Sequence, residues 1–289
     1  MRTEPDCLAC FVTQAARTVQ RLGGDERQQE RAVRAVLEIL ARVDHDQPPP
    51  RIARAVYRAI GGVLGLDDPY AAVKRETTAL ALAALPGLRR RVAASEDPLR
   101  TALLVALAGN IIDFGTGHAF DLEQTIDRVL ADGAAVDHIS ELRRELERAR
   151  RVLYLADNAG EIVLDRLLLE QIAPGREVTV AVRGGPIIND ATLEDARAAG
   201  VEGARLIEPG VALPGIDLES SSAAFRRTFD EAELIIAKGQ GNYECLVGVT
   251  APAPLFYLFM VKCELVARLT GQPLGSAMVA SAALLAAPR

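Results

Sequence analysis

The clearest fold signal in this chain is the stretch VLYLADNAGEIVLDRLLLEQI at residues 152–172. It opens with a short apolar run, Val152–Ala156, which has the length and composition of a buried strand. Apolar residues then return at helical spacing over Glu161–Ile172. A strand that passes through a short polar loop into a helix is typical of parallel α/β sheets, so the stretch predicts that architecture.

The same alternation continues to the end of the chain. Further strands are predicted at Val178–Val182, Ala204–Ile207, Leu234–Ala237 and Pro254–Met260. Helices are predicted between and after them, at Ala191–Ala199, Leu218–Phe229 and Cys263–Leu269. The strands are almost continuously apolar, which indicates burial on both faces. We therefore predict an α/β domain at residues 151–289, with a mostly parallel sheet covered by helices on both sides.

Residues 1–150 have a different pattern. Apolar residues recur at helical spacing, as at Val33, Val36, Leu37, Leu40 and Val43, and again at Leu80, Leu82 and Leu85. Breaks between helices are predicted at Pro48–Pro50, Asp67–Pro69 and Asp132–Ala134. No run rich in strand-forming residues occurs before residue 150. The sequence thus predicts an all-helical N-terminal domain, residues 1–150, ahead of the α/β domain.

Composition narrows the class of protein. With 289 residues, 49% of them hydrophobic, the chain can form one large or two ordinary domains with a sizeable core. A formal net charge of −6 argues against nucleic acid or an anionic membrane as a partner. The best candidate for a membrane span, Ala102–Ile112, is too short, and the charged residues within Met1–Cys10 argue against a signal peptide. We expect a soluble cytoplasmic protein, and the sequence leaves open whether it forms a homo-oligomer.

Three polar loops follow predicted strands. They read DNAGE at residues 157–161, RGGPIIND at residues 183–190 and KGQGNYE at residues 238–244. The carboxyl ends of parallel strands meet at one edge of a sheet, where ligands bind, so we expect the loops to converge there. Asp157, Asn158 and Asp190 would then lie together, with Lys238 nearby.

Oxygen ligands of this kind suit Mg²⁺ or Mn²⁺ and leave positions for water and a substrate phosphate. A metal together with a lysine is equipment for phosphoryl chemistry. A structural alternative stays open, because Asn158 with Glu161 has the spacing of a capping box, and Asp190 could cap the next helix.

These loops also carry a resemblance. Together with Cys7-Leu8-Ala9-Cys10, the stretch AGNIIDFG at residues 108–115 and Lys262-Cys263, they resemble the prokaryotic branch of the damage-control phosphatase family. That family was formerly catalogued as domain of unknown function 89, or as the acidic-residue-methyltransferase-like metal-binding domain. The resemblance covers nearly the whole chain, and the joint occurrence of the motifs is specific.

The resemblance implies a helical N-terminal part on a Rossmann-like, three-layer α/β/α core. It implies a divalent metal, Mn, Mg, Co or Ni, and metal-dependent removal of phosphate from small phosphorylated metabolites, including damaged ones. Members that act on sugar phosphates carry an arginine where this chain has Glu244. An acidic side chain repels phosphate, which argues against a sugar-phosphate substrate.

Motifs and resemblance together assign the candidate site residues. The predicted metal ligands are Asp157, Asn158 and Asp190, and the predicted catalytic residues are Asp157, Lys238 and Lys262. The predicted substrate contacts are Asn110, Asp113, Gly185, Gln240, Gly241, Asn242, Glu244 and Lys262. Whether water or Asp157 is the nucleophile stays open. Lysine is rare here, with three among 33 basic residues, which suggests that Lys238 and Lys262 are retained for their compact ammonium. The third, Lys74, falls in a helical stretch and is expected to be solvated.

Two other functions remain as alternatives. A carboxyl methyltransferase using S-adenosylmethionine is disfavoured, because such enzymes usually place a glycine-rich loop after the first strand, where this chain has Asp157-Asn158. A non-enzymatic protein that binds metal or metabolites is the other. Cys7 and Cys10 lack a second pair to complete a zinc site nearby, so we expect structural thiols first and metal ligands second.

Overall fold

The computed structural model describes residues 1–111 and 122–285, so Asp113 lies outside the described part. Helices precede the sheet: α1 (Pro5–Arg21), α2 (Glu26–Leu40), α3 (Pro49–Leu64), α4 (Ala71–Ala93), α5 (Pro98–Ile111), α6 (Leu122–Asp132) and α7 (Ile139–Arg148). Later helices alternate with strands: α8 (Glu161–Ile172), α9 (Leu193–Ala198), α10 (Ala223–Asp230), α11 (Gln240–Leu246) and α12 (Glu264–Thr270). The strands are β1 (Val136–Asp137), β2 (Arg151–Leu155), β3 (Glu177–Ala181), β4 (Arg205–Ile207), β5 (Leu234–Lys238), β6 (Leu255–Met260) and β7 (Ala277–Ser281).

In the described part of the chain the strands form one sheet in the order β1-β7-β6-β5-β2-β3-β4. Neighbouring strands run parallel except for β6 and β7, so the predicted mostly parallel sheet is confirmed. The sequence did not predict β1 and β7. A two-residue strand such as β1 leaves no periodic signal, and β7 joins the sheet through its antiparallel pairing with β6.

The strand order reverses between β2 and β5. From β2 the chain moves outward through β3 and β4, then returns to place β5 on the other side of β2. The loops that follow β2 and β5 therefore leave the sheet at a switch point, where the two connections separate and open a crevice. This topology places the loop at residues 157–161 beside Gly239.

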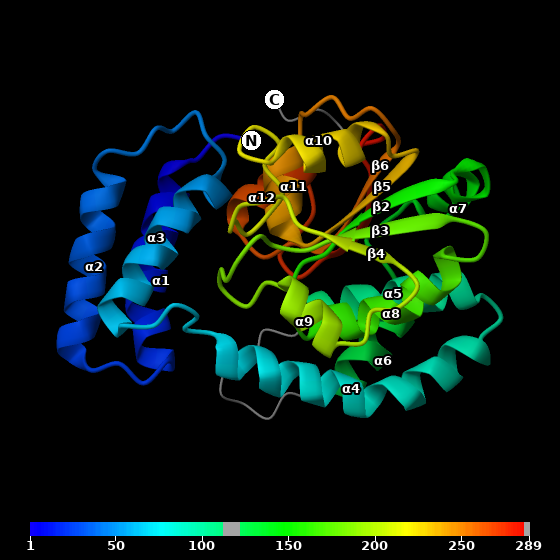
Figure 1. Cartoon of the computed structure of the whole chain (residues 1–289), viewed down its shortest axis with the longest axis horizontal. Helices are drawn as coiled ribbons and strands as arrows, with labels where there is room; N and C mark the ends of the chain where they lie inside the picture. Colours follow the sequence, from blue (N-terminus) through cyan, green and yellow to red (C-terminus); the bar gives the residue numbers. More distant parts are fainter. Residues whose placement is uncertain (112–121, 286–289) are drawn as a thin grey trace.

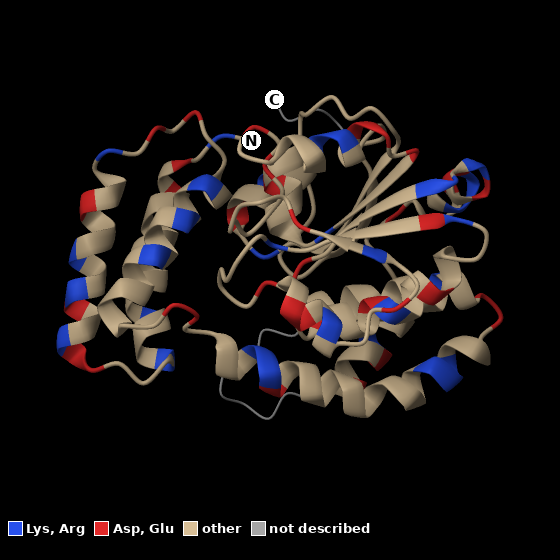
Figure 2. Cartoon of the chain, in the orientation of Figure 1, with Lys and Arg blue, Asp and Glu red and all other residues tan. Residues whose placement is uncertain are grey.

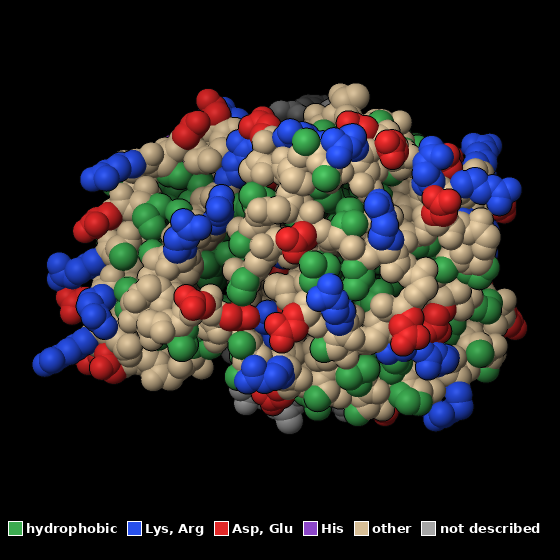
Figure 3. Space-filling model, in the orientation of Figure 1, with side chains coloured by type: hydrophobic (Ala, Val, Ile, Leu, Met, Phe, Trp, Pro, Cys, Tyr) green, Lys and Arg blue, Asp and Glu red, His purple; other side chains and the backbone are tan. Residues whose placement is uncertain are grey.

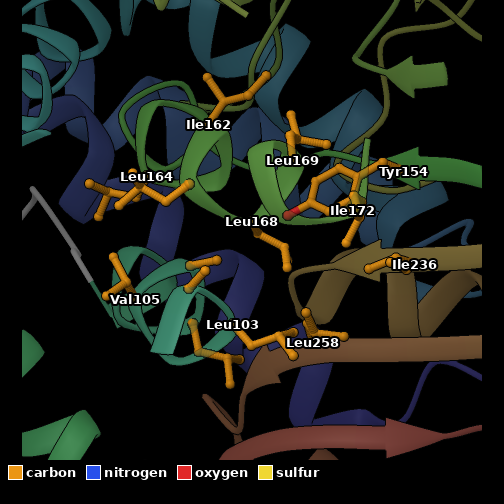
Figure 4. Packing of buried hydrophobic residues seen from close by; sticks show 14 of the residues in the cluster. Leu103, Val105, Tyr154, Ile162, Leu164, Leu168, Leu169, Ile172, Ile236 and Leu258 are labelled. Atoms are coloured by element: carbon orange, nitrogen blue, oxygen red, sulfur yellow. The ribbon is translucent and has the colours of Figure 1, made fainter. Parts of the chain in front are cut away.

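Helices cover the sheet on both faces, as predicted (Figure 1). On one face α5 and α8 pack together against β2, β5 and β6 (Figure 4). On the other face, aromatic side chains of α10 and α11 pack against the same strands, as Phe225, Phe229 and Tyr243 do. Adjacent residues of β2 point to opposite faces of the sheet. Tyr154 packs in the core on the first face, and Leu155 packs in the core on the second.

The first three helices have a core of their own. Side chains of α1, α2 and α3 form a separate apolar cluster, and Figure 1 shows these helices beside the sheet-bearing part. In contrast, α4 to α7 contribute to the same core as the sheet. The domain division at residue 150 stays a prediction, and the apolar cores divide nearer to residue 70.

Lys74 was expected to be solvated, but the structure buries it, with only 4% of its surface exposed. Its ammonium forms ion pairs with Asp68 at 2.8 Å and with Asp195, in α9, at 2.9 Å. The expectation was wrong because helical periodicity does not report charges that other elements bring to a helix face. The ion pairs of Lys74 therefore connect α4 to α9 and to the turn that follows α3.

The described helices include none that is long and apolar enough to cross a membrane.

Candidate active site

The loops after β2 and β3 are joined by backbone hydrogen bonds. Asn158 and Asp190 form an isolated antiparallel bridge. The Ala159 amide donates to the Asn189 carbonyl at 2.9 Å, and the Ala191 amide donates to the Asp157 carbonyl at 2.7 Å. The three predicted metal ligands therefore lie together at the carboxyl edge of the sheet.

Neither Asn158 nor Asp190 caps a helix. Helix α8 has Gly160 at its N-cap and no side-chain cap. Helix α9 is capped by Thr192, whose hydroxyl accepts from the Asp195 amide in a capping box. The structural alternative to a site is thus not realised, and the two side chains are left for other contacts.

Two asparagines join Asp157 to Glu161. Asn110 Nδ2 donates to Asp157 Oδ2 and to Glu161 Oε2, each at 2.9 Å. Asn158 Nδ2 donates to the same two oxygens, each at 3.0 Å. Since the amino group of Asn158 faces two carboxylates, its carbonyl oxygen is left free to bind a cation. Asn110 uses its oxygen as well, accepting from the Met260 amide at 3.2 Å, so the whole amide is engaged in holding the carboxylates in place.

Arg183, which the sequence analysis did not select, lies between the two aspartates. It is 1% exposed, and its Nε donates to Asp190 Oδ2 at 2.6 Å. One Nη donates to Asp157 Oδ1 at 3.2 Å, and the other donates to Asn242 Oδ1 at 3.3 Å. The signal for Arg183 was its position as the first polar residue after β3. It was overlooked because a predicted metal site directs attention to acids.

Lys238 lies beneath the aspartates, not at the open edge. It is fully buried, and its ammonium donates to Glu161 Oε1 at 2.6 Å, to Asp165 Oδ1 at 2.5 Å and to the Ala106 carbonyl at 3.1 Å. Three protein acceptors satisfy the three donors of an ammonium. Lys238 therefore has no hydrogen left for a substrate. Asp165, one helical turn after Glu161, also escaped the sequence analysis, although an acid on an apolar helix face was a usable signal.

These groups make up one buried charge cluster that holds more acid than base. Its members are the carboxylates Asp157, Glu161, Asp165 and Asp190 and the cations Arg183 and Lys238. Four carboxylates against two cations leave an excess of two negative charges, which burial makes unfavourable.

The pKa values in the cluster reflect that excess. Burial raises the pKa of Asp190 to about 7, although Arg183 opposes the shift. Burial also raises the pKa of Asp165 to about 7 and the pKa of Asp157. For Glu161, burial by itself would raise the pKa, but the charge of Lys238 and the hydrogen bond from Asn110 outweigh burial and hold the pKa below its usual range. Protons or a divalent cation can each supply the missing positive charge.

The donor set fits a divalent cation. Among residues 1–111 and 122–285, no three His, Cys, Asp or Glu side chains are arranged as a metal site. The set here comprises two carboxylates and one amide oxygen, a chemistry that suits hard cations such as Mg²⁺ and Mn²⁺. The excess of two negative charges matches the charge of such an ion.

Gly239 allows the loop after β5 to approach Asp157. Its backbone has φ of +79°, and a Cβ at this position would lie 2.0 Å from Asp157 Oδ2. Only glycine combines that backbone conformation with that contact. Gly241 is also confined, because an added Cβ would lie 1.9 Å from the Pro214 carbonyl oxygen, and Gly185 lies half-buried in the loop after β3.

Lys262 and the first turn of α11 form the accessible part of the site. Lys262 is exposed, and its positive charge helps to lower the pKa of Asp157 against the effect of burial. Gln240 accepts from the Lys262 amide at 2.8 Å and donates to Glu244 Oε1 at 2.7 Å. Burial raises the pKa of the Glu244 carboxyl to about 7. Asn242, by contrast, is fully buried, and its side-chain amide accepts from the Ile216 amide and donates to the Lys238 carbonyl.

The cysteines are all free thiols, and Cys10 is exposed. Burial raises the pKa of Cys7 to about 11 and also raises that of Cys263. Thiols of this kind are poor nucleophiles at neutral pH.

Comparison with known proteins places the chain in a family. The family model described as "Damage-control phosphatase ARMT1-like domain" matches residues 3–278. The chain belongs to this family. The match spans the helical part, the buried charge cluster and Lys262, so the damage-control phosphatase domain includes every element of the site.

Relatives named as damage-control phosphatases align over nearly their whole length. One from Pyrococcus horikoshii is 34% identical, covering 96% of this chain and 96% of that protein. Another, from Archaeoglobus fulgidus, is 36% identical, covering 95% of this chain and 97% of that protein. The crystal structure of a DUF89-family protein from Pyrococcus horikoshii superimposes with a TM-score of 0.89 at 32% identity, over 97% of this chain and 99% of that one.

Proposed function

We propose that this member of the damage-control phosphatase family is a metal-dependent phosphatase of small phosphorylated metabolites. The observation that carries the proposal is the buried charge cluster, whose excess of two negative charges lies at the switch point of the sheet. The names of the relatives agree with it.

Asp157, Asn158 and Asp190 would hold a divalent cation, Mn, Mg, Co or Ni. When bound, the metal would neutralise charge on the non-bridging oxygens of the phosphoryl group. Arg183 bridges the two aspartates and orients them through its hydrogen bonds to both. Asp157 and Glu161 both accept from the amino group of Asn158, which leaves its carbonyl oxygen for the cation.

Lys238 acts as a positioning residue in this proposal, although the sequence analysis assigned it to catalysis. Its ammonium holds Glu161, and Glu161 accepts from both asparagines that bind Asp157. The charge of Lys238 also keeps Glu161 ionised. The cation available to a phosphoryl oxygen is Lys262, which is exposed beside the site.

A phosphate-release screen tests the activity. The purified protein is assayed with p-nitrophenyl phosphate and a set of phosphometabolites, each with Mn²⁺, Mg²⁺, Co²⁺ or Ni²⁺. We expect release that depends on the metal and stops with EDTA. Methyl transfer from S-adenosylmethionine without phosphate release would overturn the proposal in favour of the methyltransferase alternative.

Lys262→Arg should not be a conservative change. A compact ammonium approaches a phosphoryl oxygen as a point charge, whereas a guanidinium is larger and planar. We expect kcat/KM for p-nitrophenyl phosphate to fall at least roughly tenfold, about 1.4 kcal/mol of transition-state stabilisation. Affinity for Mn²⁺, measured by calorimetry, should change little. Wild-type kinetics would instead show that the Lys262 stem merely covers the start of α12.

Glu244→Gln should change how stability depends on pH. Because the pKa of Glu244 is raised to about 7 from a usual 4.5, the folded protein retains a proton that the unfolded chain releases. The stabilising effect is complete below about pH 4.5 and is lost as the pH rises through 7. The variant should therefore melt higher than the wild type at pH 8 and equally at pH 4.

Glu202→Gln, an exposed substitution between α9 and β4, serves as the control for this comparison. Equal melting temperatures of wild type and Glu244→Gln across the whole pH range would contradict the assigned pKa.

A further inference from the structure

A cavity of about 410 Å³ lies beside the candidate active site. One wall is formed by α3 and the turn at residues 65–70, and the other by Pro186–Ile188. That second wall belongs to the loop that also carries Asp190. Figure 3 shows the surface hollowed between helices α1–α3 and the part of the molecule that contains the sheet.

Helix α3 presents a row of arginines on this side (Figure 2). Arg51, Arg54 and Arg58 are three and four residues apart, so they share one helix face. Arg51 is neutralised by Asp217, with hydrogen bonds of 2.9 and 2.6 Å, and by Glu219 at 2.6 Å. In the described part of the chain, Arg54 and Arg58 have no such partner, and both line the cavity.

The unpartnered state of Arg54 is unusual because its Nε is buried. No hydrogen-bond acceptor is found for this buried N–H in the structure. A buried donor without a partner is costly, and such atoms in folded proteins call for an explanation. A guanidinium that forms no ion pair with an acid of the described residues is suited to an anion from outside.

The acids of the lining do not cancel these charges. Asp68 is engaged by the Lys74 ammonium at 2.8 Å and accepts from the Tyr70 amide at 3.0 Å. Asp67 is exposed, so solvent screens its charge. Arg58 is exposed and screened in the same way, so Arg54 is the charge of the lining that is left without compensation.

The cavity adjoins the site. Ile187 lines it, and the carbonyl of Ile187 accepts from the Asp190 amide at 3.1 Å. Ile188, in the other wall, has φ of +46°, a left-handed conformation that is an outlier for a β-branched residue. Strain of this kind is concentrated at ligand clamps. A molecule in the cavity would thus contact the loop that positions Asp190.

We propose that this cavity binds a second oxyanion of the substrate, a carboxylate or another phosphate, with Arg54 as the main contact and Arg58 as the second. The inference rests on the proposed function and narrows its substrate class. The substrate would carry one phosphoryl group at Asp157 and Asp190, and another anionic group on a spacer reaching α3.

Matched substrates test the inference. Three substrates carry a carboxylate besides the phosphate: 2-phosphoglycolate, 3-phosphoglycerate and 6-phosphogluconate. Their counterparts have a hydroxymethyl group in place of the carboxylate: 2-hydroxyethyl phosphate, glycerol 3-phosphate and sorbitol 6-phosphate. Ribulose 1,5-bisphosphate against ribulose 5-phosphate tests a second phosphate. We expect kcat/KM to favour the doubly anionic member at least roughly tenfold in one or more pairs, through a lower KM.

Variants identify the residues. Arg54→Met and Arg58→Met should each reduce the preference, with p-nitrophenyl phosphate hydrolysis unchanged. Asp67→Asn should leave it nearly unchanged, because solvent screens the charge of that exposed carboxylate. Arg31→Met, an exposed substitution on α2, is the control. Equal kcat/KM within every pair, or a preference that survives in both arginine variants, would overturn the inference.

A binding measurement separates this outcome from failure of the proposed function. If no phosphate is released from p-nitrophenyl phosphate with any metal, the phosphatase proposal fails. The cavity is then judged by thermal shift, because a ligand that binds only the folded state stabilises it more as its concentration rises above Kd. A larger shift with 6-phosphogluconate than with sorbitol 6-phosphate, absent in Arg54→Met, would support the cavity. Equal shifts would refute it.

Discussion

Asp157→Asn should abolish metal-dependent activity and leave the fold intact. Asp157 is a proposed metal ligand, and the substitution removes a charge while preserving its shape. We expect kcat/KM to fall at least about 1000-fold, on the order of 4 kcal/mol of transition-state stabilisation. Mn²⁺ affinity, measured by calorimetry, should fall with it. Without metal, the melting temperature should be unchanged or higher, because the buried excess of negative charge falls from two to one.

Asp190→Asn should behave in the same way, and Asp230→Asn, exposed at the end of α10, is the matched control. Undiminished Mn²⁺ affinity in both Asp157→Asn and Asp190→Asn would refute the proposed metal site. A fall in melting temperature without metal would show that Arg183, rather than an external cation, is the principal partner of these carboxylates.

Lys238→Met should be the most destabilising single change at the site. The substitution leaves Glu161 and Asp165 buried without their cation. Breaking a buried ion pair by removing one partner costs about 3–5 kcal/mol. We expect a loss of stability in that range by urea denaturation, and loss of activity in proportion to the unfolded fraction.

The double variant Lys238→Met with Asp165→Asn separates positioning from catalysis. It removes one charge of each sign, so the excess of two negative charges is preserved, and more than half of the lost stability should return. Because Lys238 donates only to protein acceptors, kcat/KM for p-nitrophenyl phosphate should lie within about tenfold of the wild type. A stable double variant with at least roughly 1000-fold lower kcat/KM would show instead that Lys238 contacts the transferring phosphoryl group.

The role of Lys238 shows how a correct local prediction can lead to a different conclusion in three dimensions. The sequence placed a lysine at the end of a strand, and the structure agrees. The side chain, however, turns toward α8, where two acids one helical turn apart accept its hydrogens. Alternation along β5 places Lys238 on the same face as Leu234 and Ile236, which pack in the core that contains α8. The acids that meet the ammonium come from another element, so the pattern of the strand does not reveal them.

Lys74 illustrates the same limit. Its helical context was predicted, but its burial depends on Asp68 and Asp195, which lie in a turn and in α9. Asp68 is close to Lys74 along the chain, but Asp195 lies more than one hundred positions away. Helical spacing around Lys74 gives no sign of that second contact.

The amino-acid sequence by itself determined the class of fold and the edge at which to look. Apolar runs of strand length, followed by polar loops and helices, predict a parallel sheet, and the ends of such strands meet at one edge. Asp157, Asn158 and Asp190 could be selected for that reason. Local pattern suffices here because alternation along the chain sets which segments are buried.

Only the tertiary structure decided how the charges are compensated. Arg183, Glu161 and Asp165 belong to one cluster because folding removes four carboxylates from water and brings two cations among them. The energy of a charge depends on its burial and on its neighbours in space, neither of which is encoded in spacing along the chain. The same holds for Arg54, whose buried and unpartnered nitrogen becomes visible only when α3 faces the loop after β3.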